Sequence, residues 1–306
     1  MGNRNEIMLE INALIPTDSH ALDTVRRKYL KALHEYTWNN VICYYSWWLQ
    51  KPEANPNAVS INDDDKNWFM NAVYKLDKTK NLDIILHTPW WGISAAESIV
   101  HYLRSIFDKS KIRVIIPQMA MSAWTMIACS ANKILMWKQS NIWPIDPQIR
   151  WMSARWVIEW FQKAKEEIIT TPAIMPLRQV LISKYSPDFI IQCIKAKDQT
   201  NEIVNKWLQS NMFSKSKKAK KIEQALKVTK FLWDNDTHKE HARHISLNDC
   251  KKIWLKVESL EADQTLQDLV LSVHHSYMHT FWMSASIKAI ENHLWTAYFK
   301  HVPVVQ

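Results

Sequence analysis

Glycine is almost absent from this chain of 306 residues, which contains only two. Average usage near 7% predicts roughly 21 glycines in a chain of this length. Because glycine alone adopts positive φ without steric cost, a globular α/β chain of this size should need many of them. Tryptophan, normally among the rarest residues, occurs 17 times. Either the fold avoids positions that need glycine, or tryptophan stands at such positions.

Motifs built on glycine are missing as well. Neither G-x-G-x-x-G nor G-x-x-x-x-G-K-[ST] occurs, so a glycine-fingerprint dinucleotide site or a P-loop is unsupported. The four cysteines are widely spaced without a C-x-x-C pair, so we expect free thiols and a cytoplasmic location. The N-terminus lacks the apolar core of a signal peptide. The uncharged run 114–131 is interrupted by Pro117 and polar residues, so we expect a buried strand and helix there and no transmembrane segment.

The chain carries an excess of positive charge, with a formal net charge of +9. Much of this excess lies in KSKKAKK, residues 215–221. Such a run can form a patch for nucleic acid or another acidic surface, or it can be a solvated helix face. Because no aromatic residues interleave the lysines, the solvated face is favoured and no nucleic-acid partner is expected.

The first half of the chain alternates between strand-like and helix-like segments. Short apolar runs rich in β-branched residues predict strands at 41–45, 82–88, 112–117 and 133–136. Helical spacing of apolar residues predicts helices at 20–36, 62–76, 93–107 and 122–131. This alternation indicates an α/β fold with a mostly parallel sheet and crossover helices.

The second half has mainly helical character. We expect helices at 152–168, 176–210, 214–227, 265–278 and 284–293. No internal repeat or clear linker is present, so the sequence predicts a single α/β domain over 1–306. Its helical additions are an N-terminal extension at 1–38, an insertion at 169–235 and a C-terminal extension at 258–306.

Two strand–turn–helix segments have the properties of a catalytic apparatus. Ser122 begins an apolar helix directly after a buried strand, where free N–H groups and the helix dipole favour developing negative charge. The turn at 89–92 begins another helix and could supply backbone N–H groups to an oxyanion. A third turn, at 139–148, follows the strand at 133–136. By spacing alone, however, a serine at a helix start is usually only an N-cap.

Longer motifs in these segments carry a family resemblance. They read HTPWWGISAAESIVHYLRS (87–105), VIIPQMAMSAWTMIACSANKILM (114–136) and QSNIWPIDPQ (139–148). Two further stretches fit the same pattern, DTHKEHARHISLNDCKKIWLKV (236–257) and KAIENHLWTA (288–297). Together they resemble the serine dehydrogenase proteinase family, which is related to Clp protease and signal peptide peptidase A. The resemblance implies a ClpP/crotonase-like fold, a serine peptidase acting on peptide or protein substrates, and a homo-oligomer. An unfoldase partner is not identified by these motifs.

The resemblance also implies roles for individual residues. Ser122 matches the nucleophile, Asp146 matches the triad aspartate, and His238 is the best match to the histidine base. The N–H groups of Trp91 and Ala123 fall at the positions of the oxyanion hole. No metal and no cofactor are expected.

Several assignments keep an alternative. Asp146 could be only a turn residue before Pro147. His241 could replace His238 as the base, or share a metal with it, although a solvated polar loop is favoured over a metal site. Lys163 could act as the base of a Ser–Lys dyad, although a solvated lysine is favoured there. His87 could line the pocket or pack in the core.

Tryptophan occupies positions where the family pattern has glycine. These positions are Trp90, Trp91, Trp124, Trp143 and Trp254, and Trp137 fits the same pattern. An oxyanion turn needs backbone freedom, and an indole at a Cβ-free contact overpacks it by about 1–3 kcal/mol. Several such sites would exceed a typical stability of about 5–15 kcal/mol. We therefore hypothesise that many of these tryptophans replace glycine, through substitution or a misread sequence, and that the chain as written folds poorly or is inactive.

Two other functions stay open at this point. A crotonase-like acyl-CoA enzyme would share the fold and the oxyanion hole without needing a nucleophilic serine. A non-catalytic oligomeric scaffold is expected if the tryptophans are genuine.

Overall fold

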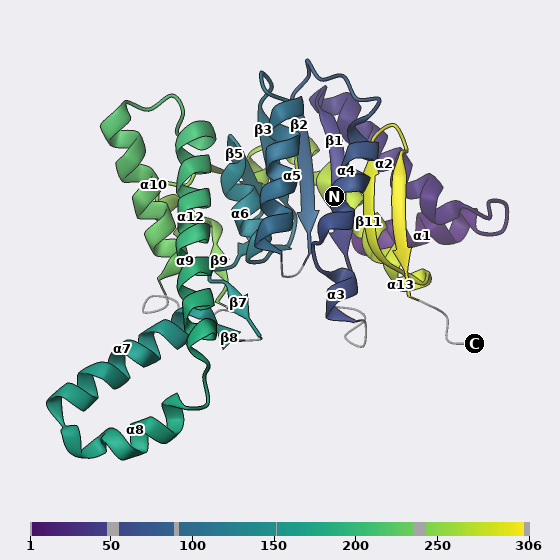
Figure 1. Cartoon of the computed structure of the whole chain (residues 1–306). Helices are drawn as coiled ribbons and strands as arrows, with labels where there is room; N and C mark the ends of the chain where they lie inside the picture. Colours follow the sequence, from purple (N-terminus) through teal and green to yellow (C-terminus); the bar gives the residue numbers. More distant parts are fainter. Residues whose placement is uncertain (1, 48–54, 89–91, 151, 235–242, 303–306) are drawn as a thin grey trace.

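A seven-stranded sheet runs through the centre of the molecule (Figure 1). The computed structural model describes residues 2–47, 55–88, 92–150, 152–234 and 243–302. In spatial order the strands are β10 (Val257–Ser259), β5 (Lys133–Met136), β3 (Ile112–Ile116), β2 (Leu82–His87), β1 (Asn40–Ser46), β11 (Ser286–Asn292) and β12 (Ala297–His301). The first five strands are parallel to one another, whereas β11 and β12 pair antiparallel. The mostly parallel α/β sheet predicted from the sequence is therefore confirmed.

The inner strands have the composition of strands that are covered on both faces. All seven residues of β1 and all six of β2 are buried. Parallel strands read as continuous apolar runs because crossover helices cover both sides of the sheet. The four strands expected at 41–45, 82–88, 112–117 and 133–136 are all present within one or two residues of their predicted bounds.

Helices cover the two faces of the sheet. On one face the core includes residues of α4 (Asp63–Val73), α5 (Ile93–Ile106) and α6 (Ala123–Ser130). On the other face it includes residues of α2 (Ala21–Thr37) and α13 (Gln264–Met283), and α1 (Arg4–Leu14) packs against both of these helices. The short helix α3 (Pro56–Val59) precedes α4. Ser122 follows β3 by six residues and directly precedes α6.

Two small sheets and a set of helices follow the central strands. Strands β4 (Met119–Ala120), β6 (Asn141–Ile142) and β9 (Ile245–Ser246) form one small sheet, and β7 (Gln148–Ile149) pairs with β8 (Met152–Ser153). The helices are α7 (Ala154–Thr170), η1 (Pro172–Ile174), α8 (Met175–Ile182), α9 (Pro187–Trp207), η2 (Leu208–Met212), α10 (Lys218–Trp233), α12 (Leu247–Lys252) and η3 (Leu260–Ala262). Figure 1 shows α7 and α8 projecting from the body as an arm.

One expected helix is wrong. Residues 284–293 were predicted to be helical, but residues 286–292 form β11 between β1 and β12. All seven residues of β11 are buried, including the polar Lys288, Glu291 and Asn292. Each of these three side chains has a hydrogen-bond partner in a distant part of the chain, so local periodicity does not reveal the strand. In the described part of 258–306, α13 is therefore followed by two strands, β11 and β12, that complete the sheet.

Three tryptophans adopt the left-handed backbone conformation that favours glycine. They are Trp38 (φ 57°), Trp254 (φ 70°) and Trp295 (φ 69°), and they make up three of the five non-glycine residues with positive φ in the described ranges. Trp38 ends α2 and donates its N–H to the His34 carbonyl, and Trp295 lies in the turn between β11 and β12. Glycine is the default residue at such helix ends and tight turns. The fold therefore does not avoid positions that need glycine; at these three positions tryptophan occupies them.

Candidate active site

Ser122 has a strained backbone at the start of α6. Its φ is 45° and its ψ is −102°, and its side chain makes no capping hydrogen bond to the helix. The side chain is partly exposed, although every residue of α6 is buried. Non-glycine residues in sparsely populated regions are held there by the surrounding structure and cluster at functional sites. Ser122 thus occupies the N-cap position of α6 without its side chain making the capping hydrogen bond expected of a plain N-cap.

The helix that begins after Ser122 offers backbone donors beside the serine. Ala123 is the first residue of α6, so its N–H is one of the groups that the helix itself cannot satisfy. The Trp124 N–H donates to the Met121 carbonyl at 2.9 Å, and the Met126 N–H donates to the Ser122 carbonyl at 3.1 Å. An N–H at a helix start can donate to a developing negative charge.

The segment that joins β2 to α5 begins beside this helix start. Thr88 forms a parallel β-bridge with Ala120, two residues before Ser122. Gly92, at the other end of the turn, caps α5 with φ 89°. A Cβ on Gly92 would lie 2.7 Å from the Ile61 carbonyl oxygen, so glycine is required there by both conformation and space. Trp90 and Trp91, between these two ends, lie outside the described residues.

A buried ion pair fixes the loop on which Gly92 rests. The Lys288 Nζ lies 3.0 Å from both carboxylate oxygens of Asp65 and also donates to the Ser60 carbonyl. Asp65 accepts further hydrogen bonds from the Tyr44 hydroxyl at 2.8 Å and from the Asn62 N–H at 2.9 Å. The side chains of Lys288 and Asp65 are 1% and 2% exposed, and burial lowers the pKa of Lys288 despite the adjacent carboxylate.

Sequence reasoning missed this pair. Because Asp65 lies in the run NDDD and Lys288 lies in a segment read as a helix, neither residue stood out. The signal available in the sequence was Lys288 itself, a lysine between the apolar residues Ile287 and Ala289. Burying an ion pair costs desolvation free energy, so its contribution here is best understood as fixing the loop 60–62 rather than as net stability.

Asp146 is fully buried at the start of α7. It accepts hydrogen bonds at 3.2 Å from the Arg155 N–H and from the Gln148 side-chain amide. Burial raises the pKa of Asp146 to about 6, although the hydrogen bonds from Ser153 and Arg155 act in the opposite direction. These contacts stabilise the start of α7 and hold the carboxyl group in one orientation.

The chain on both sides of residues 235–242 is held next to these elements. Before this segment, the Arg155 guanidinium binds Asp234 at 3.2 Å. After it, the His244 ring lies against the Trp143 ring in a tilted contact with ring centroids 5.8 Å apart. Strand β9 pairs with β6, which in turn pairs with β4 before Ser122. The predicted base His238 and its alternative His241 lie in this segment, outside the described residues. The residue before this segment contacts Arg155, which also binds Asp146, and the strand after it belongs to the same small sheet as β4, which precedes Ser122.

The remaining predicted residues fall in several places. Lys163 is exposed on α7, in the arm. His87 faces the core beside Tyr45 and His274, and burial lowers the pKa of His87 to about 4, so it packs in the core rather than lining a pocket. Trp124 is fully buried, with its ring 4.3 Å from the ring of Tyr44.

Metal-ligand clusters and membrane-spanning helices are both absent from the described ranges. Within them, no group of three or more His, Cys, Asp or Glu side chains could hold a metal ion. Within the same ranges, no helix is both long enough and apolar enough to cross a membrane.

Comparisons with known proteins identify the family. Residues 56–263 match the sequence profile of the ClpP-like SDH-type serine proteinases. One uncharacterized protein of Methanocaldococcus jannaschii is 31% identical over 149 residues, which are 48% of this chain and 50% of that protein. A second uncharacterized protein of the same organism is 36% identical over 89 residues, 29% of this chain and 30% of that protein. The chain thus spans half or less of the length of these curated relatives. Because the profile match covers most of the chain and includes Ser122 and Asp146, the chain belongs to the ClpP-like SDH-type serine proteinase family.

Proposed function

We propose that this protein is a serine peptidase in which Ser122 is the nucleophile, His238 the base and Asp146 the residue that orients the base. The observation that carries the proposal is the backbone of Ser122, strained at a helix start with its side chain unused as a cap. Family membership and the burial of Asp146 support it further. Four buried free cysteines support a reducing, cytoplasmic setting.

In this mechanism the base removes the proton from the Ser122 Oγ as that oxygen attacks the scissile carbonyl carbon. The oxyanion that forms is stabilised by the N–H groups of Ala123 and of residue 91. The C–N bond then breaks, and the leaving nitrogen takes the proton from the base. Water, activated by the same base, hydrolyses the acyl ester and frees Ser122.

The test is hydrolysis of casein or a fluorogenic peptide by the chain with glycine at the family positions. Replacing Ser122 or His238 by alanine should lower kcat by at least about 10³-fold, because the members of a triad act as a unit. Ser105→Ala, on the exposed face of α5, is the matched control and should leave kcat unchanged. Equal hydrolysis by Ser122→Ala would refute the proposal. A loss in His241→Ala or Lys163→Ala, with His238→Ala active, would reassign the base.

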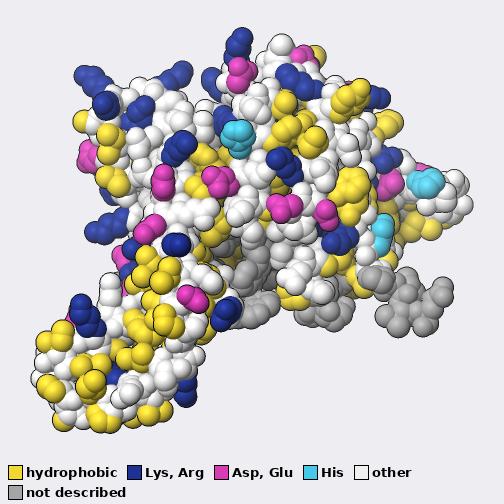
Figure 2. Space-filling view, viewed as in Figure 1, with side chains coloured by type: hydrophobic (Ala, Val, Ile, Leu, Met, Phe, Trp, Pro, Cys, Tyr) yellow, Lys and Arg dark blue, Asp and Glu magenta, His cyan; other side chains and the backbone are white. Residues whose placement is uncertain are grey.

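We also propose that the protein forms a homo-oligomer through the arm. Helix α8 buries none of its residues, and Figure 2 shows hydrophobic side chains gathered on the arm. The exposed apolar residues there are Trp156, Ile169, Met175, Leu177 and Val180. Contiguous exposed apolar surface of this kind marks interaction sites. Size-exclusion chromatography should show a multimer that Leu177→Glu dissociates, and a monomeric parent protein would refute the idea.

A further inference from the structure

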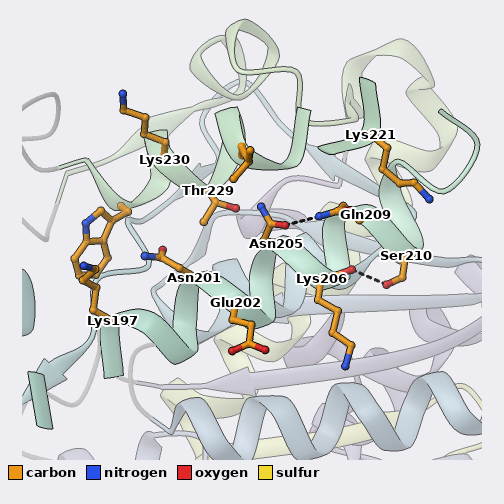
Figure 3. A pocket seen from close by; sticks show the side chains of 12 residues that line it. Lys197, Asn201, Glu202, Asn205, Lys206, Gln209, Ser210, Lys221, Thr229 and Lys230 are labelled. Atoms are coloured by element: carbon orange, nitrogen blue, oxygen red, sulfur yellow. Dashed lines mark hydrogen bonds between the residues drawn. The ribbon is translucent and has the colours of Figure 1, made fainter. Parts of the chain in front are cut away.

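A groove between α9 and α10 lies outside the candidate active site. Its volume is about 810 Å³, within the range of ligand sites. Its lining residues come from both helices, and Figure 3 shows them from close by. The groove also receives Lys221 from the lysine run KSKKAKK, which the proposed peptidase mechanism does not use.

A row of side-chain amides forms one side of this groove. Asn201 and Asn205 lie on α9 and Gln209 on the adjoining π-helical turn η2, each four residues from the next, and Figure 3 shows them on the side that faces Thr229 of α10. Successive members of the row are therefore separated by about 6 Å along the helix axis. Two residues of an extended peptide span about 6.6–6.8 Å, so alternate peptide units can reach successive amides.

These amides present the functions that a peptide backbone requires. The Gln209 amide donates to the Asn205 carbonyl oxygen, so the pair offers the NH₂ group of Asn205 and the carbonyl oxygen of Gln209 to a ligand. The Asn201 carbonyl oxygen is buried and has no hydrogen-bond partner among the described residues. A buried acceptor without a partner is costly, and a rotation of the Asn201 side chain that opens this oxygen to the groove would let a peptide N–H satisfy it.

The charge around the groove selects among peptides. Four lysines line it, namely Lys197, Lys206, Lys221 and Lys230. Among the lining residues the one carboxylate is Glu202, which points away from Thr229 in Figure 3. A groove with this excess of positive charge attracts anionic partners and repels basic ones.

We propose that this groove binds an extended acidic segment of the protein substrate, at a docking site distinct from Ser122. Its role in substrate capture rests on the proposed peptidase function. The amide row recognises the peptide backbone, and the lysines select aspartate and glutamate side chains.

Fluorescence anisotropy on the full chain carrying Ser122→Ala measures docking without cleavage. A labelled glutamate-rich peptide should bind, and a lysine-rich peptide of equal length should not. Asn205→Ala should weaken binding by about fivefold, the equivalent of one ordinary hydrogen bond. Lys206→Gln and Lys230→Gln should weaken it at low salt and have less effect at high salt, because salt screens exposed charges.

The control is Lys184→Gln, an exposed lysine between α8 and α9 that lies off the groove and should leave binding unchanged. Because the lysine variants alter exposed side chains, a loss of binding in them does not report misfolding. Equal binding of glutamate-rich and lysine-rich peptides, or tighter binding of a single-stranded oligonucleotide, would overturn the proposal. Docking of the acidic peptide by a chain that hydrolyses no substrate would retain the groove and refute the peptidase instead.

Discussion

Replacing the left-handed tryptophans by glycine should stabilise this protein. Trp38 and Trp295 hold φ values of 57° and 69°, and their side chains are 72% and 54% exposed. Little buried apolar surface is therefore lost when either indole is removed. A non-glycine residue in this conformation costs about 1–3 kcal/mol, whereas glycine costs about 0.5–1 kcal/mol in extra backbone entropy on folding. We expect each replacement to raise the free energy of unfolding by about 1 kcal/mol.

Trp254 provides an internal comparison. Its φ is 70°, but the Lys227 ammonium lies 3.6 Å from the centroid of its ring. A cation–π contact contributes about 0.5–1 kcal/mol at an exposed site, so its loss offsets much of the relief of strain. Trp254→Gly should therefore change stability less than Trp295→Gly does. It should also change stability less than Trp38→Gly does, because the Lys80 ammonium lies farther from the Trp38 ring centroid, at 5.8 Å.

Urea denaturation of the single variants measures these differences. The matched control is Trp156→Gly, because Trp156 is similarly exposed, at 56%, but lies in the right-handed helix α7. Glycine in a helix costs up to about 1 kcal/mol, so this variant should be less stable than the parent. If Trp38→Gly and Trp295→Gly lower the midpoint as Trp156→Gly does, strain at the left-handed positions is not the cause.

Three further predictions concern the Lys288–Asp65 ion pair, the buried His87 and the mass of the protein. Lys288→Met should destabilise the protein by about 3–5 kcal/mol because it leaves the Asp65 carboxylate buried and unpaired. The double variant Lys288→Met/Asp65→Leu should recover stability but not kcat, with KM little changed. Full activity in the double variant would show that the pair does not position the turn at 89–92. Burial lowers the pKa of His87 to about 4, so between pH 6.5 and about 4 the unfolded chain binds a proton that the folded chain does not. Stability should fall over that range by up to about 3 kcal/mol, and His87→Leu should flatten the fall in urea melts at pH 7 and pH 5. Intact mass of the natural protein should lie below the 36.2 kDa of the written sequence, by whole multiples of the difference between tryptophan and glycine; a match to 36.2 kDa would show that the tryptophans are present.

The sequence predicted the sheet well where burial and periodicity agree. Strands β1, β2, β3 and β5 are continuous apolar runs, and this pattern needs no knowledge of the rest of the chain. Strand β11 was missed because its polar residues are satisfied by distant partners. The Glu291 carboxylate binds the Arg26 guanidinium at 2.6 Å, and the Asn292 amide donates to the Ala72 carbonyl. Pairings across more than 200 residues leave no trace in local sequence.

The candidate site was predicted in part for a similar reason. Motif resemblance located Ser122 and Asp146, but only the backbone shows that Ser122 is strained and does not cap its helix. The Lys288–Asp65 pair joins residues 223 positions apart, so no spacing in the sequence indicates it.

The tryptophans at positions that need glycine were also identified partly from the sequence and partly from the structure. The family pattern identified Trp254, which the backbone shows to be left-handed, whereas Trp38 and Trp295 emerged from their φ values alone. Trp124 is different, because it lies in the regular helix α6 with its ring fully buried. For that position the argument for glycine rests on the family pattern and on packing beside Ser122, not on backbone conformation.

The central claim is that Ser122 is the nucleophile of a peptidase, and covalent labelling tests it most directly. The chain with glycine at the family positions should react with a fluorophosphonate probe, and peptide mapping by mass spectrometry should place one adduct on Ser122. Ser122→Ala should remain unlabelled while its circular dichroism matches that of the parent. A well-folded parent that acquires no adduct, or acquires it on another residue, would contradict the account.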